Sequence, residues 1–228
     1  MAKPKPAYIS EWSYTRWSTH DQCNLKGKFK FVDKLPDPPG PAADRGIFYH
    51  SIAEMYINRK MSTFPVELQG LGFDEKFDQL REQEPLTEHR IGLTRQWTET
   101  GFFGKDVWGR VVYDVIYYTP ADKTVHIIDH KTGKMYPEHE EQLDLYNLTG
   151  LLLFPDAEQS VAEDWYLDQG AHIGVPRTMS RKLVEPMKQF WQARIDVMEN
   201  DRIYAARPGR HCNWCAYAKR KGGPCSFG

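Results

Sequence analysis

The sequence predicts an α/β domain in which helices flank a central mixed β-sheet. Helical periodicity gives way to three short strands, and a second helical stretch is followed by a fourth strand. Three strands in succession, then a helix that crosses over to a fourth, are typical of a sheet that combines antiparallel and parallel pairs. The segments are 42–61 (helix), 89–98, 106–118 and 124–131 (strands), 138–154 (helix) and 159–168 (strand).

The first helix follows a proline-rich loop and carries apolar residues on one stripe, including Phe48 and Ile52. The strands are rich in Val, Ile, Tyr and Trp and are separated by turn residues. Outside a core of about 42–170, we expect an N-terminal helix over 10–24 and a long helix over 180–202. We expect one domain over 1–228, ending in a compact, irregular tail (203–228).

Bulk composition is that of a soluble globular enzyme, with 228 residues, 40% hydrophobic and 27% charged. No stretch approaches the ~20 apolar residues of a membrane span. The first residues, Met-Ala-Lys-Pro-Lys-Pro, lack the apolar stretch of a secretory signal. We therefore expect a cytoplasmic protein without a membrane partner. The net charge of −1 neither favours nor excludes nucleic acid, because the distribution of charge matters more than its sum.

Asp129 and Lys131 alternate onto one face of the strand over 124–131. Hydrolysis of a phosphodiester needs this combination, because carboxylates hold a divalent cation that activates water and a lysine stabilises charge on the phosphate. An isolated Asp-x-Lys is common and is usually a surface ion pair. The preceding strand strengthens the case, since Asp114 lies well inside an apolar run, where a charge is costly unless it is paired or bound to metal. The alternative for Asp114 is a place at a strand end.

These residues resemble motifs of the RecB-like PD-(D/E)XK nucleases, which include the exonuclease domain of AddB, CRISPR-associated exonucleases and many phage exonucleases. The most specific similarity is to the Asp-x-Lys-Thr-Gly-Lys signature. One departure is Gly109, five residues before Asp114, where the family usually has Gly-x-x-Asp. The segments that carry the resemblance are Ser13–Trp17 with Cys23, Arg45–Glu54, Asp114, Ile128–Lys134 and Gln142–Tyr146.

The resemblance implies a restriction-endonuclease-like core and a site that holds Mg²⁺ or Mn²⁺. Gln142 and Tyr146 are one helical turn apart and could both reach the scissile phosphate, or could simply pack against the sheet. A lone helical histidine is usually a surface or core residue, whereas the family motif makes His50 a ligand. The implied catalytic residues are Asp114, Asp129, Lys131, Gln142 and Tyr146, and the implied metal ligands are His50, Asp114, Asp129 and His130.

The four cysteines are arranged as one N-terminal residue and three clustered near the C-terminus. Disulfides are not expected in a reducing compartment, which leaves metal binding or burial. The arrangement resembles the iron–sulfur staple of the AddB and CRISPR-associated nucleases, and it implies a 4Fe–4S cluster that joins the N- and C-terminal segments. Structural Zn²⁺ is the main alternative, because thiolates bind both metals. The residues are Cys23, Cys212, Cys215 and Cys225.

We expect a metal-dependent DNA exonuclease of DNA processing or recombination, similar to stand-alone phage or accessory nucleases. The basic run Lys219, Arg220 and Lys221 is either part of a DNA path or ordinary surface. The sequence has no GxxxxGK[ST] motif, so a helicase or single-strand annealing protein would be another chain. The alternatives are a non-catalytic nucleic-acid-binding module of the same fold and a restriction-type endonuclease.

Overall fold

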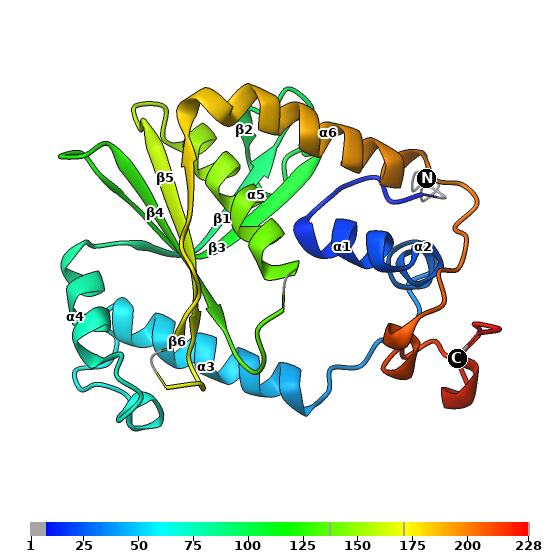
Figure 1. Ribbon diagram of the computed structural model, residues 1–228, viewed down its shortest axis with the longest axis horizontal. Helices are drawn as coiled ribbons and strands as arrows, with labels where there is room; N and C mark the ends of the chain where they lie inside the picture. Colours follow the sequence, from blue (N-terminus) through cyan, green and yellow to red (C-terminus); the bar gives the residue numbers. More distant parts are fainter. Residues whose placement is uncertain (1–7, 137, 171, 228) are drawn as a thin grey trace.

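An open seven-stranded sheet forms the centre of the molecule (Figure 1), which a computed structural model describes over residues 8–136, 138–170 and 172–227. The strand order is β2-β1-β3-β4-β5-β6, and β7 also pairs with β5. The strands are β1 (Leu86–Leu93), β2 (Glu99–Thr100), β3 (Gly109–Thr119), β4 (Thr124–Lys131), β5 (Gln159–Tyr166), β6 (His172–Ile173) and β7 (Arg177–Ser180).

The expected mixed sheet is confirmed. Strands β1, β3 and β4 form an antiparallel meander. The helix α5 (Glu138–Leu153) then crosses over to β5, which lies parallel to β4 along the whole length of both strands. The register places Asp129 beside Asp164 and Lys131 beside Tyr166. This crossover brings the polar end of β4 and one face of α5 together.

Helices cover both faces of the sheet (Figure 1). On one face, α5, α1 (Tyr14–Gln22) and α6 (Val184–Asn200) pack over Ile91 and Ile127. On the other face, α3 (Pro41–Ile57) and α4 (Asp74–Glu82) pack over Val115 and Ile128. Both clusters consist of buried apolar side chains, so the sheet is covered on two sides as the near-continuous apolar strands require.

The N-terminal helix is shorter than expected. It begins at Tyr14, where the Ser13 hydroxyl caps it by accepting a hydrogen bond from the Arg16 amide at 3.3 Å. Ser13 has an extended backbone (φ −148°, ψ 167°), and Trp12 before it forms a bridge with Gly109 instead. A Cβ on Gly109 would lie 2.3 Å from the Trp12 ring, so the Trp12 ring can pack at this position only because residue 109 has no side chain.

The ends of other strands and helices differ from the expected positions for local reasons. Strand β1 ends at Leu93 rather than residue 98, because Trp97 has a left-handed backbone (φ 62°) in the turn that follows. Sequence periodicity did not reveal α4, whose residues are mainly polar apart from buried Phe77 and Leu80. The long C-terminal helix runs from Val184 to Asn200. Short elements complete the fold: α2 (Asn24–Gly27), a π-helical segment (Lys28–Val32) and single turns at Val66–Leu68, Arg181–Leu183, Arg210–Asn213 and Lys219–Lys221.

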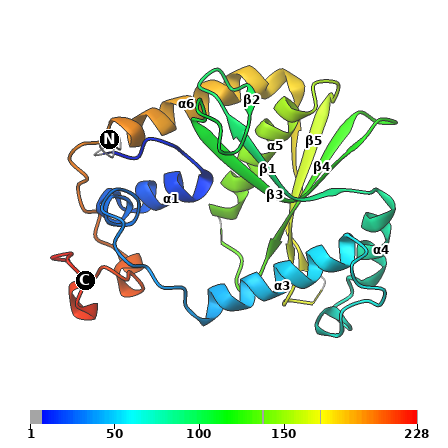
Figure 2. The same ribbon diagram turned by 180° about the vertical axis from the view of Figure 1, so that it is seen from behind.

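The segments near the two ends of the sequence lie together at one end of the molecule (Figures 1 and 2). Asp201, which follows α6, accepts hydrogen bonds from the Asn24 side chain at 2.6 Å and pairs with His20 at 2.8 Å. Trp17 of α1 packs edge-on against Trp191 of α6, with ring centroids 4.9 Å apart. Among the helices that the structure describes, none has the length and apolar character to cross a membrane.

Candidate active site

Asp129 and Lys131 lie on the face of β4 that points toward α5, and they form an ion pair. Both side chains are largely buried, at 5% and 16% exposed. Burial works to lower the pKa of Lys131, but the charge of Asp129 outweighs it and raises this pKa above the usual value. Lys131 therefore keeps its positive charge inside the site.

Two side chains of α5 extend this pair into a row. The Lys131 ammonium donates to the Gln142 amide oxygen at 2.8 Å, and the Gln142 amide nitrogen donates to the Tyr146 hydroxyl at 2.8 Å. Burial and the charges of Asp129 and Asp114 raise the pKa of Tyr146 well above its ordinary value. We call Asp129, Lys131, Gln142 and Tyr146, the residues for which the resemblance implies a catalytic role, the catalytic row.

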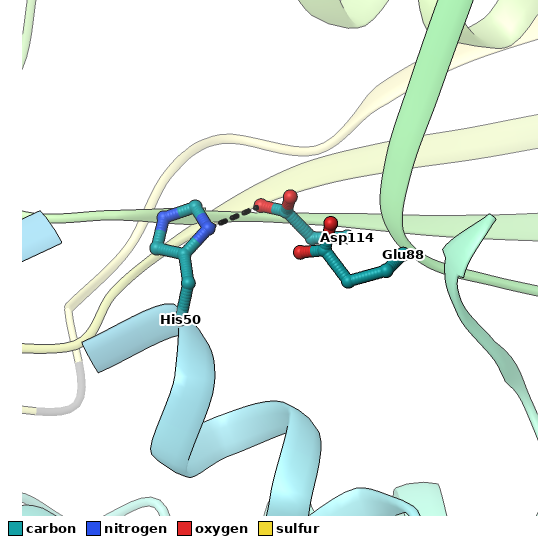
Figure 3. Close-up of side chains that lie close together, drawn as sticks. All are labelled: His50, Glu88 and Asp114. Carbon is teal, nitrogen blue, oxygen red and sulfur yellow. Dashed lines mark ion pairs between the residues drawn. The ribbon is translucent and has the colours of Figure 1, made fainter. Parts of the chain in front are cut away.

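A second group lies beside this row, where His50 of α3 faces Asp114 of β3 (Figure 3). His50 Nδ1 is 3.4 Å from Asp114 Oδ2, and the same oxygen accepts a hydrogen bond from the His130 amide at 2.7 Å. Burial opposes the charge on both partners, yet their interaction prevails: it raises the pKa of His50 and lowers that of Asp114. The interaction therefore favours a protonated imidazole beside an ionised carboxylate.

Glu88 of β1 completes this group and was not anticipated from the sequence. One ligand atom each from His50, Glu88 and Asp114 lie within 4.8 Å of one another (Figure 3). Burial, followed by repulsion from Asp114, raises the pKa of Glu88. An imidazole and two carboxylates are the donors that Mn²⁺ and, through the oxygens, Mg²⁺ bind. The chemistry of the donor set thus fits a divalent cation.

Asp164 is a further acid that the sequence did not single out. It lies beside Asp129 in the β4–β5 register, and the two residues are 4% and 3% exposed. Burial and the charge of Asp129 raise the pKa of Asp164 to about 7. Burial and the mutual repulsion of Asp114, Asp129 and Asp164 raise the pKa of Asp129 and Asp164, and a bound cation would relieve this repulsion.

His130 differs from its expected role as a ligand. Its ring lies on the opposite face of β4 from Asp129, packed against Phe77 and Trp165, with centroids 5.9 and 6.4 Å apart. Burial lowers the pKa of His130 to about 4, so the ring is neutral. The alternation of a strand explains this placement, because residues 129 and 131 point one way and 130 the other. His130 still borders the site, because its backbone amide donates to Asp114 and its ring lies edge-on to that of His50, with ring centroids 5.8 Å apart.

The four cysteines line one small pocket between the segment after α1 and the C-terminal tail. Two of them accept backbone hydrogen bonds: the Arg207 amide is 3.4 Å from Cys23 Sγ, and the Gly209 amide is 3.4 Å from Cys212 Sγ. Amide donors of this kind stabilise thiolates that bind metal. The basic run lies on the same segment, and Arg220 donates to the Cys212 carbonyl oxygen at 2.9 Å. Arg220 thus supports the cysteine loop.

A family model described as the PD-(D/E)XK nuclease superfamily matches residues 11–220. The chain belongs to this superfamily. Its metal-dependent nuclease chemistry is consistent with the catalytic row and with the donor set of His50, Glu88 and Asp114. The match also runs through the segment that holds Cys212 and Cys215.

Two solved structures resemble this superfamily member. The first, SSO0001, is 14% identical with a TM-score of 0.48, and the match covers 99% of this chain and 88% of that one. The second, a candidate exonuclease from Eubacterium rectale, is 12% identical with a TM-score of 0.49, and the match covers 97% of this chain and 90% of that one. The curated proteins gave no match.

Proposed function

We propose that this PD-(D/E)XK nuclease is a deoxyribonuclease that uses Mg²⁺ or Mn²⁺, and that it degrades DNA from an end. The observation that carries the proposal is the catalytic row beside His50, Glu88 and Asp114. His50, Glu88 and Asp114 would hold the cation, together with Asp129, the further ligand that the resemblance implies. A divalent cation supplies a more acidic bound water and neutralises charge on the phosphate.

The residues of the row have separate tasks in this reaction. Lys131, kept charged by Asp129, stabilises the negative charge that grows on the phosphate oxygens as water attacks phosphorus. Gln142 holds the Lys131 ammonium in place, and Tyr146 holds Gln142. Water bonds to phosphorus and releases a proton to solvent, the bond from phosphorus to the leaving oxygen breaks, and that oxygen takes up a proton from solvent. The proposed partner is therefore DNA, bound along the face shared by β4 and α5.

The exonuclease assignment rests on the resemblance of the Gln142–Tyr146 pair and of the cysteine arrangement to the exonuclease branch. Labelled linear and circular DNA, incubated with Mn²⁺, tests it. We expect degradation of linear DNA and survival of the circle. Cleavage of the circle would instead favour the restriction-type alternative, and cleavage of neither would favour the non-catalytic binding module.

Substitutions test the chemistry. Asp129→Asn and Lys131→Ala should each reduce hydrolysis by at least ~100-fold, because such groups act mainly on the transition state. Lys123→Ala is the matched control, since Lys123 pairs with Glu158 on the surface at the other end of β4. Full activity in either of the first two variants would contradict the assigned site.

We further propose that Cys23, Cys212, Cys215 and Cys225 hold a 4Fe–4S cluster. Their arrangement around one pocket supports a shared metal centre. A structural Zn²⁺ is the alternative occupant, because thiolates bind both metals.

A further inference from the structure

A cavity of about 440 Å³ lies at the far side of β5 from β4. It is enclosed by β5, the first turns of α5, the loop before α5 and the connection from β6 to β7. Asp164 forms one of its walls, and the register of the sheet sets Asp164 beside Asp129. The cavity is therefore one side chain away from the catalytic row.

The walls of this cavity are mainly apolar and aromatic. The rings of His139 and Tyr166 are inclined at only 26° to each other, and a hydrogen bond of 2.8 Å between His139 Nδ1 and the Tyr166 hydroxyl holds them in place. Tyr136 stands edge-on to His139, with ring centroids 5.6 Å apart. Flat rings among apolar side chains form a surface on which a nucleobase can stack. The apolar side chains are those of Met135, Leu143 and Val175.

The charges around the cavity suit a neutral group better than a phosphate. Among the lining residues that the structure describes, Arg177 is the only arginine or lysine. Its guanidinium group already has two anionic partners, Asp144 at 2.6 Å and Glu140 at 3.3 Å. Asp164 adds a third acidic group without a second cation. A phosphate would meet this excess of carboxylates, whereas an uncharged base would not.

Asp164 also has a hydrogen-bonding atom to spare. The residue is only 4% exposed, and its Oδ1 accepts no hydrogen bond within the part of the chain that the structure describes. A buried acceptor without a donor is costly, so a ligand that brings an N–H group gains from this position. The amino groups of nucleobases are such donors, and a carboxylate is a known acceptor for them.

We propose that this cavity binds an unstacked nucleobase of the strand that is being hydrolysed. The inference rests on the proposed nuclease function and deepens it by naming the substrate class. With the scissile phosphate at Lys131, a neighbouring base would enter the cavity past Asp164. A base leaves its stack most easily where it is unpaired. The preferred substrate is therefore a single-stranded or frayed DNA end.

Binding without cleavage tests the contact with the base. Two short fluorescent single strands are titrated with protein in EDTA, one of them with abasic sugars in place of its last three bases at the 5′ or the 3′ end. Wild type should bind the complete strand roughly 10-fold more tightly, as expected for one stacked base. Tyr136→Ala should remove most of this difference, and Tyr136→Phe should keep it. Phe190→Ala on α6 is the matched control, because Phe190 is 48% exposed and Tyr136 is 51% exposed.

Hydrolysis with Mn²⁺ separates the cavity from the nuclease assignment. Wild type should degrade a duplex with a forked end at least ~10-fold faster than a blunt duplex, and Tyr136→Ala should narrow this ratio. Equal affinity of wild type for the two strands, equal rates on the two duplexes, or equal losses in Tyr136→Ala and Phe190→Ala would overturn the inference and leave the nuclease function in place. A base preference that depends on Tyr136, in a protein that hydrolyses no DNA, would reject the nuclease function alone.

Discussion

Glu88 faces Asp114 across the β1–β3 ladder, at a point where the backbone of Glu88 turns left-handed (φ 46°). The neighbouring pairs, Thr87 with Val115 and His89 with Tyr113, keep one continuous register on either side. Tyr113 nevertheless packs on the α5 face, whereas Val115 packs on the α3 face. The local turn of both strands therefore brings two carboxylates to His50, at a backbone cost of about 1–2 kcal/mol.

Replacing Glu88 with Gln should weaken cation binding about tenfold, because a charged donor becomes a neutral one of the same shape. Titration calorimetry of the metal-free protein with Mn²⁺ measures this affinity. Glu84→Gln is the matched control, since Glu84 is also left-handed (φ 47°) but exposed. Identical Mn²⁺ affinities for the two variants would exclude Glu88 as a ligand.

Cation affinity should depend on the protonation of His50. Its pKa is raised by Asp114, despite burial, so the imidazole holds a proton above its usual pKa of ~6.5. A metal ligand must lose that proton, and Mn²⁺ affinity should therefore rise with pH until the raised pKa is passed. His50→Ala should bind Mn²⁺ more weakly and should flatten this rise. An unchanged pH dependence in that variant would contradict the role of His50.

Protein purified without oxygen should be brown, with broad absorbance near ~400 nm that bleaches on oxidation. Cys23→Ser should lose this absorbance and its iron, because it removes the thiolate that links the N-terminal segment to the tail. Trp214→Ala should keep both, since Trp214 lies between Cys212 and Cys215 but is 75% exposed. Stoichiometric zinc without iron would refute the cluster and leave the nuclease assignment intact.

The two exposed lysines of the basic run should contribute to DNA binding if this surface borders the substrate path. Lys219→Gln together with Lys221→Gln should reduce the slope of log affinity against log salt by about 2, because fewer counterions are released. Arg220 is left in place, since it supports the cysteine loop. The same change at Lys60 and Lys76, near α3 and α4, is the control. Equal slopes for both double variants would show that the basic run does not contact DNA.

Sequence patterns predicted β1, β3, β4 and β5, and the Asp129–Lys131 pair that faces α5, but not the short strands β2, β6 and β7. The period of β4 was enough to place Asp129 and Lys131 on one face, because nothing interrupts the alternation there. The sequence pattern did not indicate Glu88, because the position of its side chain depends on a left-handed backbone within a polar stretch. Asp164 could be recognised only through the register that sets it beside Asp129.

The contact between α1 and α6 forms late in folding, because the two helices are far apart in the sequence. The sheet pairs segments that are close in sequence, so its strands can assemble as they are synthesised. Trp17 must wait for Trp191, and the contact between Cys23 and the Arg207 amide spans 184 residues. Until then an indole and a thiol that end up buried are exposed to solvent and oxidants. If the proposed 4Fe–4S cluster forms there, all four of its ligands are present only once Cys225 has been synthesised, long after Cys23.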